Sequence, residues 1–268
     1  MGENPKRSMI VTLNITISMM EQVGDLAKSA GKKIMKIYDT NFTVETKADN
    51  SPVTEADRIA EGHIISGIRE GITARYPIIG EEAYSAGESP EISNNPFWLV
   101  DALDGTKSFI SKSNQFTVNI ALIDARRPVL GVIHAPALGD TYWGGPSGAF
   151  AEYSGKSART ISCRKPDARG LAVVASQNHR SPELEDFIAK LKVTSSTSVG
   201  SSLKFCLVAN GSSDIYPRLG RTMEWDIAAG HAIVNAAGGS VKKMDGSNMT
   251  YGKVGLENPD FIVRGIES

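Results

Sequence analysis

The chain has 268 residues, 41% of them hydrophobic and 22% charged, and its formal net charge at pH 7 is −1. This composition is typical of a soluble globular protein with one large domain or two closely packed halves. The near-neutral charge gives no reason to expect a nucleic-acid polymer or an anionic membrane as a partner. A small anionic substrate would therefore need a local positive site, made of side chains or of metal.

Residues 1–17 are expected to be an N-terminal extension, disordered or added to the protein. Two basic residues there precede a short apolar run that threonine and asparagine interrupt, and no signal-cleavage pattern follows. No stretch approaches the roughly 20 apolar residues of a membrane span. We expect a cytoplasmic protein without stable membrane insertion, for which only peripheral association stays open. Cys163 and Cys206 form no metal-binding pattern and are expected to be reduced, packed thiols.

Helices and strands are predicted in groups along the chain. Apolar residues at helical spacing predict a first helix over 18–38, and a strand over 42–46 follows it. A second helix opens with Thr54 as its N-cap and is expected to end at Tyr76-Pro77. Strands separated by Gly and Pro turns are then expected at 78–79, 98–100, 116–123, 129–134, 142–143 and 149–152.

The C-terminal part mixes the two kinds of element. Strands are predicted at 171–175, 193–199, 214–216, 240–244 and 261–264, and helices at 181–191, 202–210 and 225–237. The grouping lacks the strict βαβ alternation of a Rossmann sheet and predicts a layered α+β fold. We divide the chain into an N-terminal α+β half, 18–160, expected to bind metal, and a C-terminal α/β half, 161–268, expected to carry substrate-binding elements.

The most informative segment spans residues 98–106, where an apolar strand is expected to end in Asp101 and a second aspartate, Asp104, follows three residues later. Gly105 then permits a tight turn that presents backbone N–H groups. Two carboxylates with the Leu103 carbonyl between them suit a hard cation such as Mg²⁺. The N–H groups beyond them suit a phosphate oxygen.

Each acidic motif also has a simpler structural explanation. An Asp-x-x-Asp-Gly segment is often a turn, paired glutamates such as Glu81-Glu82 usually face solvent, and Asp226 suits the first turn of a helix. The combination is more informative, because two carboxylates about 5 Å apart repel by about 3 kcal/mol at an effective dielectric of about 20. Four clustered acids either take up protons or bind cations, and divalent metal is the simpler outcome.

Three segments together resemble the signatures of the inositol monophosphatase superfamily. They are Gly80-Glu81-Glu82, residues 98–106 for the family's Trp-x-x-Asp-Pro-x-Asp-Gly-Thr loop, and Trp225-Asp226-Ile227-Ala228-Ala229-Gly230. They occur in the expected order, and the resemblance covers nearly the whole chain after about residue 18. It implies the αβαβα fold, with alternating helix and sheet layers, of the inositol monophosphatases and fructose-1,6-bisphosphatases.

Within that superfamily the chain is most similar to the CysQ-type 3′(2′),5′-bisphosphate nucleotidases. The segments that carry this similarity are 49–57, 105–110, 116–123, 200–206 and 216–218. The resemblance implies a Mg²⁺-dependent phosphomonoesterase that converts adenosine 3′,5′-bisphosphate to AMP and phosphate, with the sulfated analogue as a further candidate substrate. A monomer or a homodimer is compatible with the sequence.

The resemblance also implies roles for individual residues. Two or three Mg²⁺ ions are held by Glu81, Asp101, the Leu103 carbonyl, Asp104 and Asp226. The catalytic set is Asp57, Thr106 and Glu81, in which Thr106 with Asp57 orients or deprotonates the attacking water. Substrate contacts are assigned to Leu103, Asp104, Gly105, Thr106, His179, Ser201, Lys204, Arg218 and Asp226. Without the resemblance, Asp57 is equally a helix-capping residue, and the basic residues are equally ordinary surface cations or caps.

One position departs from the family pattern, because Ala102 stands where the family has proline. Proline fixes φ and removes a backbone donor, so we expect alanine to leave the loop less pre-organised and to weaken metal affinity or activity without removing a ligand. Two alternatives to the nucleotidase stay open. One is an inositol-1-phosphate phosphatase on the same scaffold, and the other is a catalytically weak metal- and nucleotide-binding protein.

Overall fold

The computed structural model describes residues 13–47, 51–92, 95–176 and 181–266. The helices are α1 (Ile17–Tyr38), α2 (Glu55–Gly67), α3 (Glu81–Ser85), α4 (Thr106–Ile110), α5 (Pro182–Ala189), α6 (Leu203–Ala209) and α7 (Glu224–Ala236), and a π-helical turn (Ile68–Ile72) extends α2. The strands are β1 (Val44–Thr46), β2 (Pro52–Thr54), β3 (Ile78–Gly80), β4 (Phe97–Asp104), β5 (Thr117–Asp124), β6 (Arg127–Ala135), β7 (Asp140–Gly145), β8 (Gly148–Glu152), β9 (Arg159–Ile161), β10 (Leu171–Ser176), β11 (Val193–Val199), β12 (Ile215–Arg218), β13 (Thr222–Met223), β14 (Ser240–Lys243), β15 (Glu257–Asn258) and β16 (Phe261–Arg264).

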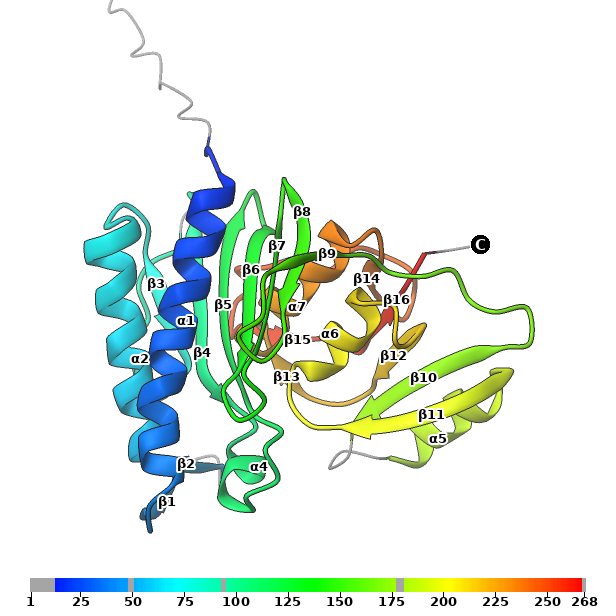
Figure 1. Cartoon of the computed structure of the whole chain (residues 1–268), viewed down its shortest axis with the longest axis horizontal. Helices are drawn as coiled ribbons and strands as arrows, with labels where there is room; N and C mark the ends of the chain where they lie inside the picture. Colours follow the sequence, from blue (N-terminus) through cyan, green and yellow to red (C-terminus); the bar gives the residue numbers. More distant parts are fainter. Residues whose placement is uncertain (1–12, 48–50, 93–94, 177–180, 267–268) are drawn as a thin grey trace, which may run out of the picture.

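Two main sheets and their helices form five layers. The larger sheet has the strand order β3-β4-β5-β6-β7-β8-β9, and the smaller has the order β11-β10-β12-β16-β14. Figure 1 shows α1 and α2 outside the larger sheet, α6 and α7 between the sheets, and α5 beside the smaller sheet on its far side. The predicted αβαβα fold is confirmed, whereas the division of the chain into halves at residue 160 stays a prediction.

Each of the two N-terminal helices is capped by a threonine side chain, of which only Thr54 was predicted. Thr16 caps α1 by accepting a hydrogen bond from the Met19 N–H at 3.1 Å, and the apolar face of the helix is buried against the larger sheet. Thr54 caps α2 as predicted, in a capping box completed by the Asp57 side chain. The expected end of this helix at Tyr76-Pro77 is wrong, because the π-helical turn ends at Ile72 and extended backbone follows.

Helix α7 packs directly on the larger sheet because glycines face it. A Cβ on Gly131 would lie 2.3 Å from the Ala229 carbonyl oxygen, and one on Gly144 would lie 2.7 Å from the Ile233 Cα. Side chains at these sheet positions would push the helix away. The close packing buries nearly every residue of α7 and fixes the position of its N-terminus.

The strand before the aspartate pair is longer than the sequence predicted. It was expected over 98–100, but β4 continues through both aspartates to Asp104, with an irregularity in its pairing with β5 between Asp101 and Asp104. The turn that follows uses Gly105 at φ +92°, a left-handed conformation in which glycine carries no steric penalty. The sharp turn therefore lies after the second aspartate and not after the first.

Several short elements were not predicted at all. They are the five-residue helices α3 and α4 and the strands β2, β9, β13 and β15, all of which are too short for a periodic pattern. The cysteine prediction is confirmed, since Cys163 and Cys206 are both free and buried. Across the described ranges of the chain, no helix is long and apolar enough to cross a membrane.

Candidate active site

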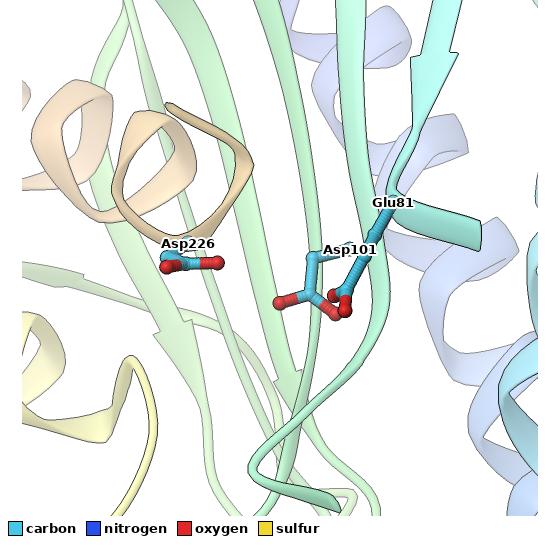
Figure 2. Close-up of side chains that lie close together, drawn as sticks. All are labelled: Glu81, Asp101 and Asp226. Carbon is cyan, nitrogen blue, oxygen red and sulfur yellow. The ribbon is translucent and has the colours of Figure 1, made fainter. Parts of the chain in front are cut away.

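Three carboxylates from distant parts of the chain meet at one point. Glu81, Asp101 and Asp226 each place a carboxylate oxygen within 4.8 Å of the others, and Figure 2 shows the three side chains directed toward one another. The parallel register of β3 and β4 pairs Gly80 with Val100, so the residues that follow this pair, Glu81 at the start of α3 and Asp101 within β4, lie side by side. Asp226 is contributed by the first turn of α7, which the glycine packing holds against the same sheet.

Burial makes this cluster unstable as a set of bare charges. Burial raises the pKa of Asp101 well above its usual range, and Glu81, Asp104 and Asp226 raise it further by repulsion. The pKa of Asp226 is raised for the same reasons, by burial first and then by Asp104 and Glu81. Asp104 also has a raised pKa because it is buried, although Lys204 opposes the shift. Such a group of acids is stabilised by a bound cation.

Lys47 supplies one positive charge beside the cluster. Its Nζ donates to Glu81 Oε1 at 2.7 Å and to Glu82 Oε1 at 2.5 Å. Burial alone lowers the pKa of Lys47, but the two glutamates more than compensate and raise it. Neither Lys47 nor Glu82 was identified from the sequence, where paired glutamates were most simply solvent-exposed. No local sequence pattern pointed to Lys47, because the residues it contacts are more than thirty positions away.

The proposed catalytic pair is formed. Thr106 Oγ1 donates to Asp57 Oδ1 at 3.2 Å, and the hydroxyl also lies 3.3 Å from the Leu103 carbonyl oxygen. The other oxygen of Asp57 accepts from the Thr54 N–H at 2.8 Å and from the Thr54 hydroxyl at 2.7 Å. Burial raises the pKa of Asp57, while the bonds from Thr54 oppose that rise. One oxygen of Asp57 therefore caps α2 while the other contacts Thr106, and the catalytic role of the residue stays a prediction.

Residues of the C-terminal half line the same cavity, which has a volume of about 770 Å³. Lys204 is buried and its Nζ donates to the carbonyl oxygens of Ser201 and Val199. Burial lowers the pKa of Lys204 to about 8, although Asp104 opposes the shift. Arg218 is also buried, at the end of β12. The sequence prediction for His179 lies outside the described residues.

Two donors in this part of the cavity have no protein partner. The Ser201 hydroxyl and the Arg218 Nε are buried, and neither makes a hydrogen bond with any described residue. An unpaired buried donor is costly, so a site that holds two of them beside a buried lysine is suited to accepting an anion. Ser201 has a φ of +48°, in the left-handed region, which indicates that the surrounding structure enforces its conformation.

A buried polar chain behind the site was also missed from the sequence. The Ser202 hydroxyl donates to Asn119 Oδ1 at 2.7 Å and lies 2.7 Å from the Thr117 hydroxyl. The backbone N–H of Ser202 helps to hold the pKa of Asp104 down against the effect of burial. Polar residues at alternate, inward-facing positions of the otherwise apolar strand β5 were the available signal.

Comparisons with known proteins identify similar chains of the same length. The model of the inositol monophosphatase family matches residues 18–263. The 3′(2′),5′-bisphosphate nucleotidase CysQ of Escherichia coli (strain K12) is 44% identical over 248 residues, which cover 91% of this chain and 99% of that protein. CysQ of Haemophilus influenzae is 33% identical over 96% of each chain.

The similar solved structures come from the same family as the relatives found by sequence. The crystal structure of CysQ from Bacteroides thetaiotaomicron, described as a bacterial member of the inositol monophosphatase family, superposes with a TM-score of 0.78 at 35% identity and covers 94% of this chain and 98% of that one. An IMPase from Thermotoga maritima superposes with a TM-score of 0.75 at 25% identity, with 92% of each chain covered.

Proposed function

This chain belongs to the inositol monophosphatase family, and we propose that it is a Mg²⁺-dependent 3′(2′),5′-bisphosphate nucleotidase that removes the 3′-phosphate of adenosine 3′,5′-bisphosphate. The observation that carries the proposal is a single cavity lined by two different sets of groups. The lining includes the carboxylates Glu81, Asp101 and Asp226, and it also includes the unpaired donors of Ser201 and Arg218. A substrate with two phosphates can use both sets.

The carboxylate set fits a hard divalent cation. Its donors are oxygens only, without histidine or cysteine, which favours Mg²⁺ over Zn²⁺ or copper. The residues that would hold the ions are Glu81, Asp101, the Leu103 carbonyl, Asp104 and Asp226. When bound, Mg²⁺ lowers the pKa of a coordinated water and neutralises charge on the phosphoryl group.

The protein's own contribution to the reaction is orientation and proton transfer. Asp57 Oδ1 accepts a hydrogen bond from the Thr106 hydroxyl, which leaves the lone pairs of Thr106 Oγ1 free to accept a hydrogen bond from the attacking water. That water attacks phosphorus as the bond to the ester oxygen breaks, and its proton passes to the Thr106–Asp57 pair. The ester oxygen takes a proton from solvent and leaves as the 3′-hydroxyl, without a covalent intermediate.

We assign substrate choice to the polar and basic groups of the C-terminal half. Ser201, Lys204 and Arg218 provide a hydroxyl, an ammonium group and a guanidinium group for the 5′-phosphate, and the guanidinium fork suits phosphate geometry. Inositol 1-phosphate has one phosphate and would leave these buried donors without a partner. The catalytically weak alternative rested on Ala102, which is buried in β4 and removes no carboxylate from the cluster.

Phosphate release measured on three substrates tests the proposal. With saturating Mg²⁺ we expect kcat/KM for adenosine 3′,5′-bisphosphate to exceed that for adenosine 3′-monophosphate and for inositol 1-phosphate by at least about 100-fold, since each lost charge-assisted contact costs about 1.5–3 kcal/mol. A preference for inositol 1-phosphate would assign the chain to the alternative phosphatase activity. Tight nucleotide binding without phosphate release would show that the site is catalytically weak.

A further inference from the structure

A buried carboxylate lies just behind the cluster and has no part in the mechanism described above. Glu61 is on α2 and is only 4% exposed. Its Oε2 accepts a hydrogen bond from the Glu82 N–H and its Oε1 accepts one from the Ala83 N–H, both at 2.8 Å. Within the described part of the chain, Glu61 forms no ion pair, so these backbone groups are the direct partners of its charge.

The Glu61 carboxylate replaces a missing helix cap. Helix α3 begins at Glu81, and its N-cap residue, Gly80, has no side chain to accept from the first N–H groups. Glu61, from another helix, accepts hydrogen bonds from two of these N–H groups. The positive end of the short helix also favours the negative charge of its carboxylate. A carboxylate from another helix thus fixes the turn that carries the metal ligand Glu81.

Gly80 is the residue that makes this contact geometrically feasible. A Cβ at position 80 would lie 2.3 Å from Glu61 Cδ and 2.5–2.6 Å from both carboxylate oxygens. The backbone of the turn therefore rests directly against the carboxyl group. Any larger residue at position 80 would displace either the Glu61 side chain or the start of α3.

The same helix face also carries the catalytic pair. Glu61 is four residues after Asp57 on α2, and residues at this spacing lie one above the other on a helix. Asp57 contacts Thr106, and Glu61 contacts the turn after Glu81. A rigid α2 therefore sets the position of the water-orienting pair relative to a carboxylate of the cluster.

We infer that Glu61 is a positioning residue for Glu81, holding its carboxylate at the distance from Asp101 that divalent-metal binding requires; the inference rests on the metal site of the proposed function. Groups that orient metal ligands in other proteins typically change metal affinity about 10–100-fold when they are replaced. Glu61 acts on the ligand through the backbone and contacts neither the metal nor the substrate.

The test is direct titration of Mg²⁺ into the purified full-length chain by calorimetry, without substrate. Glu61→Gln removes one acceptor and places an NH₂ group against a backbone N–H, and we expect its Kd for Mg²⁺ to rise about 10–100-fold. Glu61→Asp keeps the charge but is too short to reach both N–H groups, and we expect a smaller rise. Glu21→Gln, an exposed residue of α1, is the matched control and should leave the Kd unchanged.

Gly80→Ala approaches the same contact from the other side. We expect this variant to weaken Mg²⁺ binding as Glu61→Gln does. The double variant should bind Mg²⁺ no more weakly than the more affected single variant, since both changes break the same contact. At saturating Mg²⁺, the KM for the nucleotide should stay within about 2-fold of that of the wild type. A change in KM without a change in metal affinity would contradict the inference.

A purely structural role gives a different pattern. Thermal unfolding of the metal-free proteins would then show a lower Tm for Glu61→Gln while the Kd for Mg²⁺ stays that of the wild type, and this result would overturn the inference. Failure of the proposed function can be distinguished from failure of this inference, because the proposed function is tested on the wild type alone. If the wild type binds Mg²⁺ but prefers another substrate, the titration still tests the role of Glu61. If the wild type does not bind Mg²⁺, both the proposed function and the inference about Glu61 are wrong.

Discussion

Ala102 is the residue at which the chain departs from its family, and its surroundings allow the departure to be tested. It lies in the irregular part of β4 between Asp101 and Asp104, where the ladder with β5 has no pair for it. Replacing a residue outside the ladder by proline removes a backbone N–H that makes no ladder hydrogen bond, so the loss of stability is small.

We therefore predict that Ala102→Pro folds and binds Mg²⁺ several-fold more tightly than the wild type. The proline would restrict the backbone between the two aspartates and lower the entropy lost on binding, an effect of about 0.4–1 kcal/mol. Calorimetric titration of Mg²⁺ measures the change. An unchanged or weaker affinity in a folded variant would show that the alanine does not limit the site.

We predict that Lys204 makes substrate binding sensitive to pH. Its pKa is lowered by burial to about 8, below the ordinary value for lysine, so the ammonium group loses its proton as pH rises through about 8. We predict that KM for adenosine 3′,5′-bisphosphate rises between pH 7.5 and 9 as that charge is lost, by about 10-fold. Lys204→Met should have a high KM that does not change over this range. A pH-independent KM in the wild type would exclude Lys204 as a phosphate contact.

The same shift has a defined effect on stability. Because the lysine binds its proton less tightly in the folded chain than in the unfolded chain, the unfolded state holds more protons between pH 8 and the ordinary lysine pKa. The contribution of Lys204 to the free energy of unfolding therefore becomes more favourable to the folded state as pH rises through that window. The predicted loss of substrate binding at high pH would thus not be an effect of Lys204 on unfolding.

At the scale of elements, α7 depends on a buried ion pair at its first residue. Glu224 is fully buried and accepts from the backbone N–H groups of Gly252 and Lys253 and from Lys253 Nζ at 2.6 Å. These contacts tie the loop before β15 to the helix end that carries Asp226.

Lys253→Met should lower the free energy of unfolding by about 3 kcal/mol, because it leaves the Glu224 charge buried without its cation. The double variant Glu224→Gln/Lys253→Met should recover part of that loss, since neither charge then remains. Urea denaturation of the three proteins measures both effects. Equal stability of Lys253→Met and the wild type would mean that the backbone N–H groups alone satisfy Glu224.

Long periodic elements could be predicted from the sequence, whereas the five-residue helices and several of the shortest strands could not. Helix α7 was expected at 225–237 and is observed at Glu224–Ala236, because its apolar run ends at a pair of glycines. Helices α3 and α4 have only five residues, and tertiary contacts decide them. The carboxylate of Glu61 caps α3, and no local pattern in the sequence reveals a cap from a residue twenty positions away.

The candidate site shows the same division. Carboxylates at motif positions, such as Glu81 and Asp226, were identified from the sequence, and the structure brings them together with Asp101. Lys47 and Glu61 were not identified, because their importance depends on which segments the fold places beside the Gly80 turn. The metal and substrate roles of all these residues stay predictions.

In the whole molecule, elements of both sheets and of the helix layer between them contribute residues to the candidate site. Glu81 follows β3 and Asp101 lies in the neighbouring strand β4, and Asp226 reaches them from the first turn of α7. Helix α7 lies between the two sheets (Figure 1). The smaller sheet contributes Arg218 from the end of β12 to the same cavity. The fold therefore places acidic and basic groups on separate elements around one small volume.

The proposed function requires carboxylates far apart in the chain to act as one cation site. Its most direct test is the rate of phosphate release from adenosine 3′,5′-bisphosphate as a function of Mg²⁺ concentration, for the wild type and Asp226→Asn. We predict Mg²⁺-dependent turnover in the wild type and a loss of at least about 100-fold in the variant, since a ligand charge is removed. Wild-type turnover and Mg²⁺ dependence in Asp226→Asn would contradict the account.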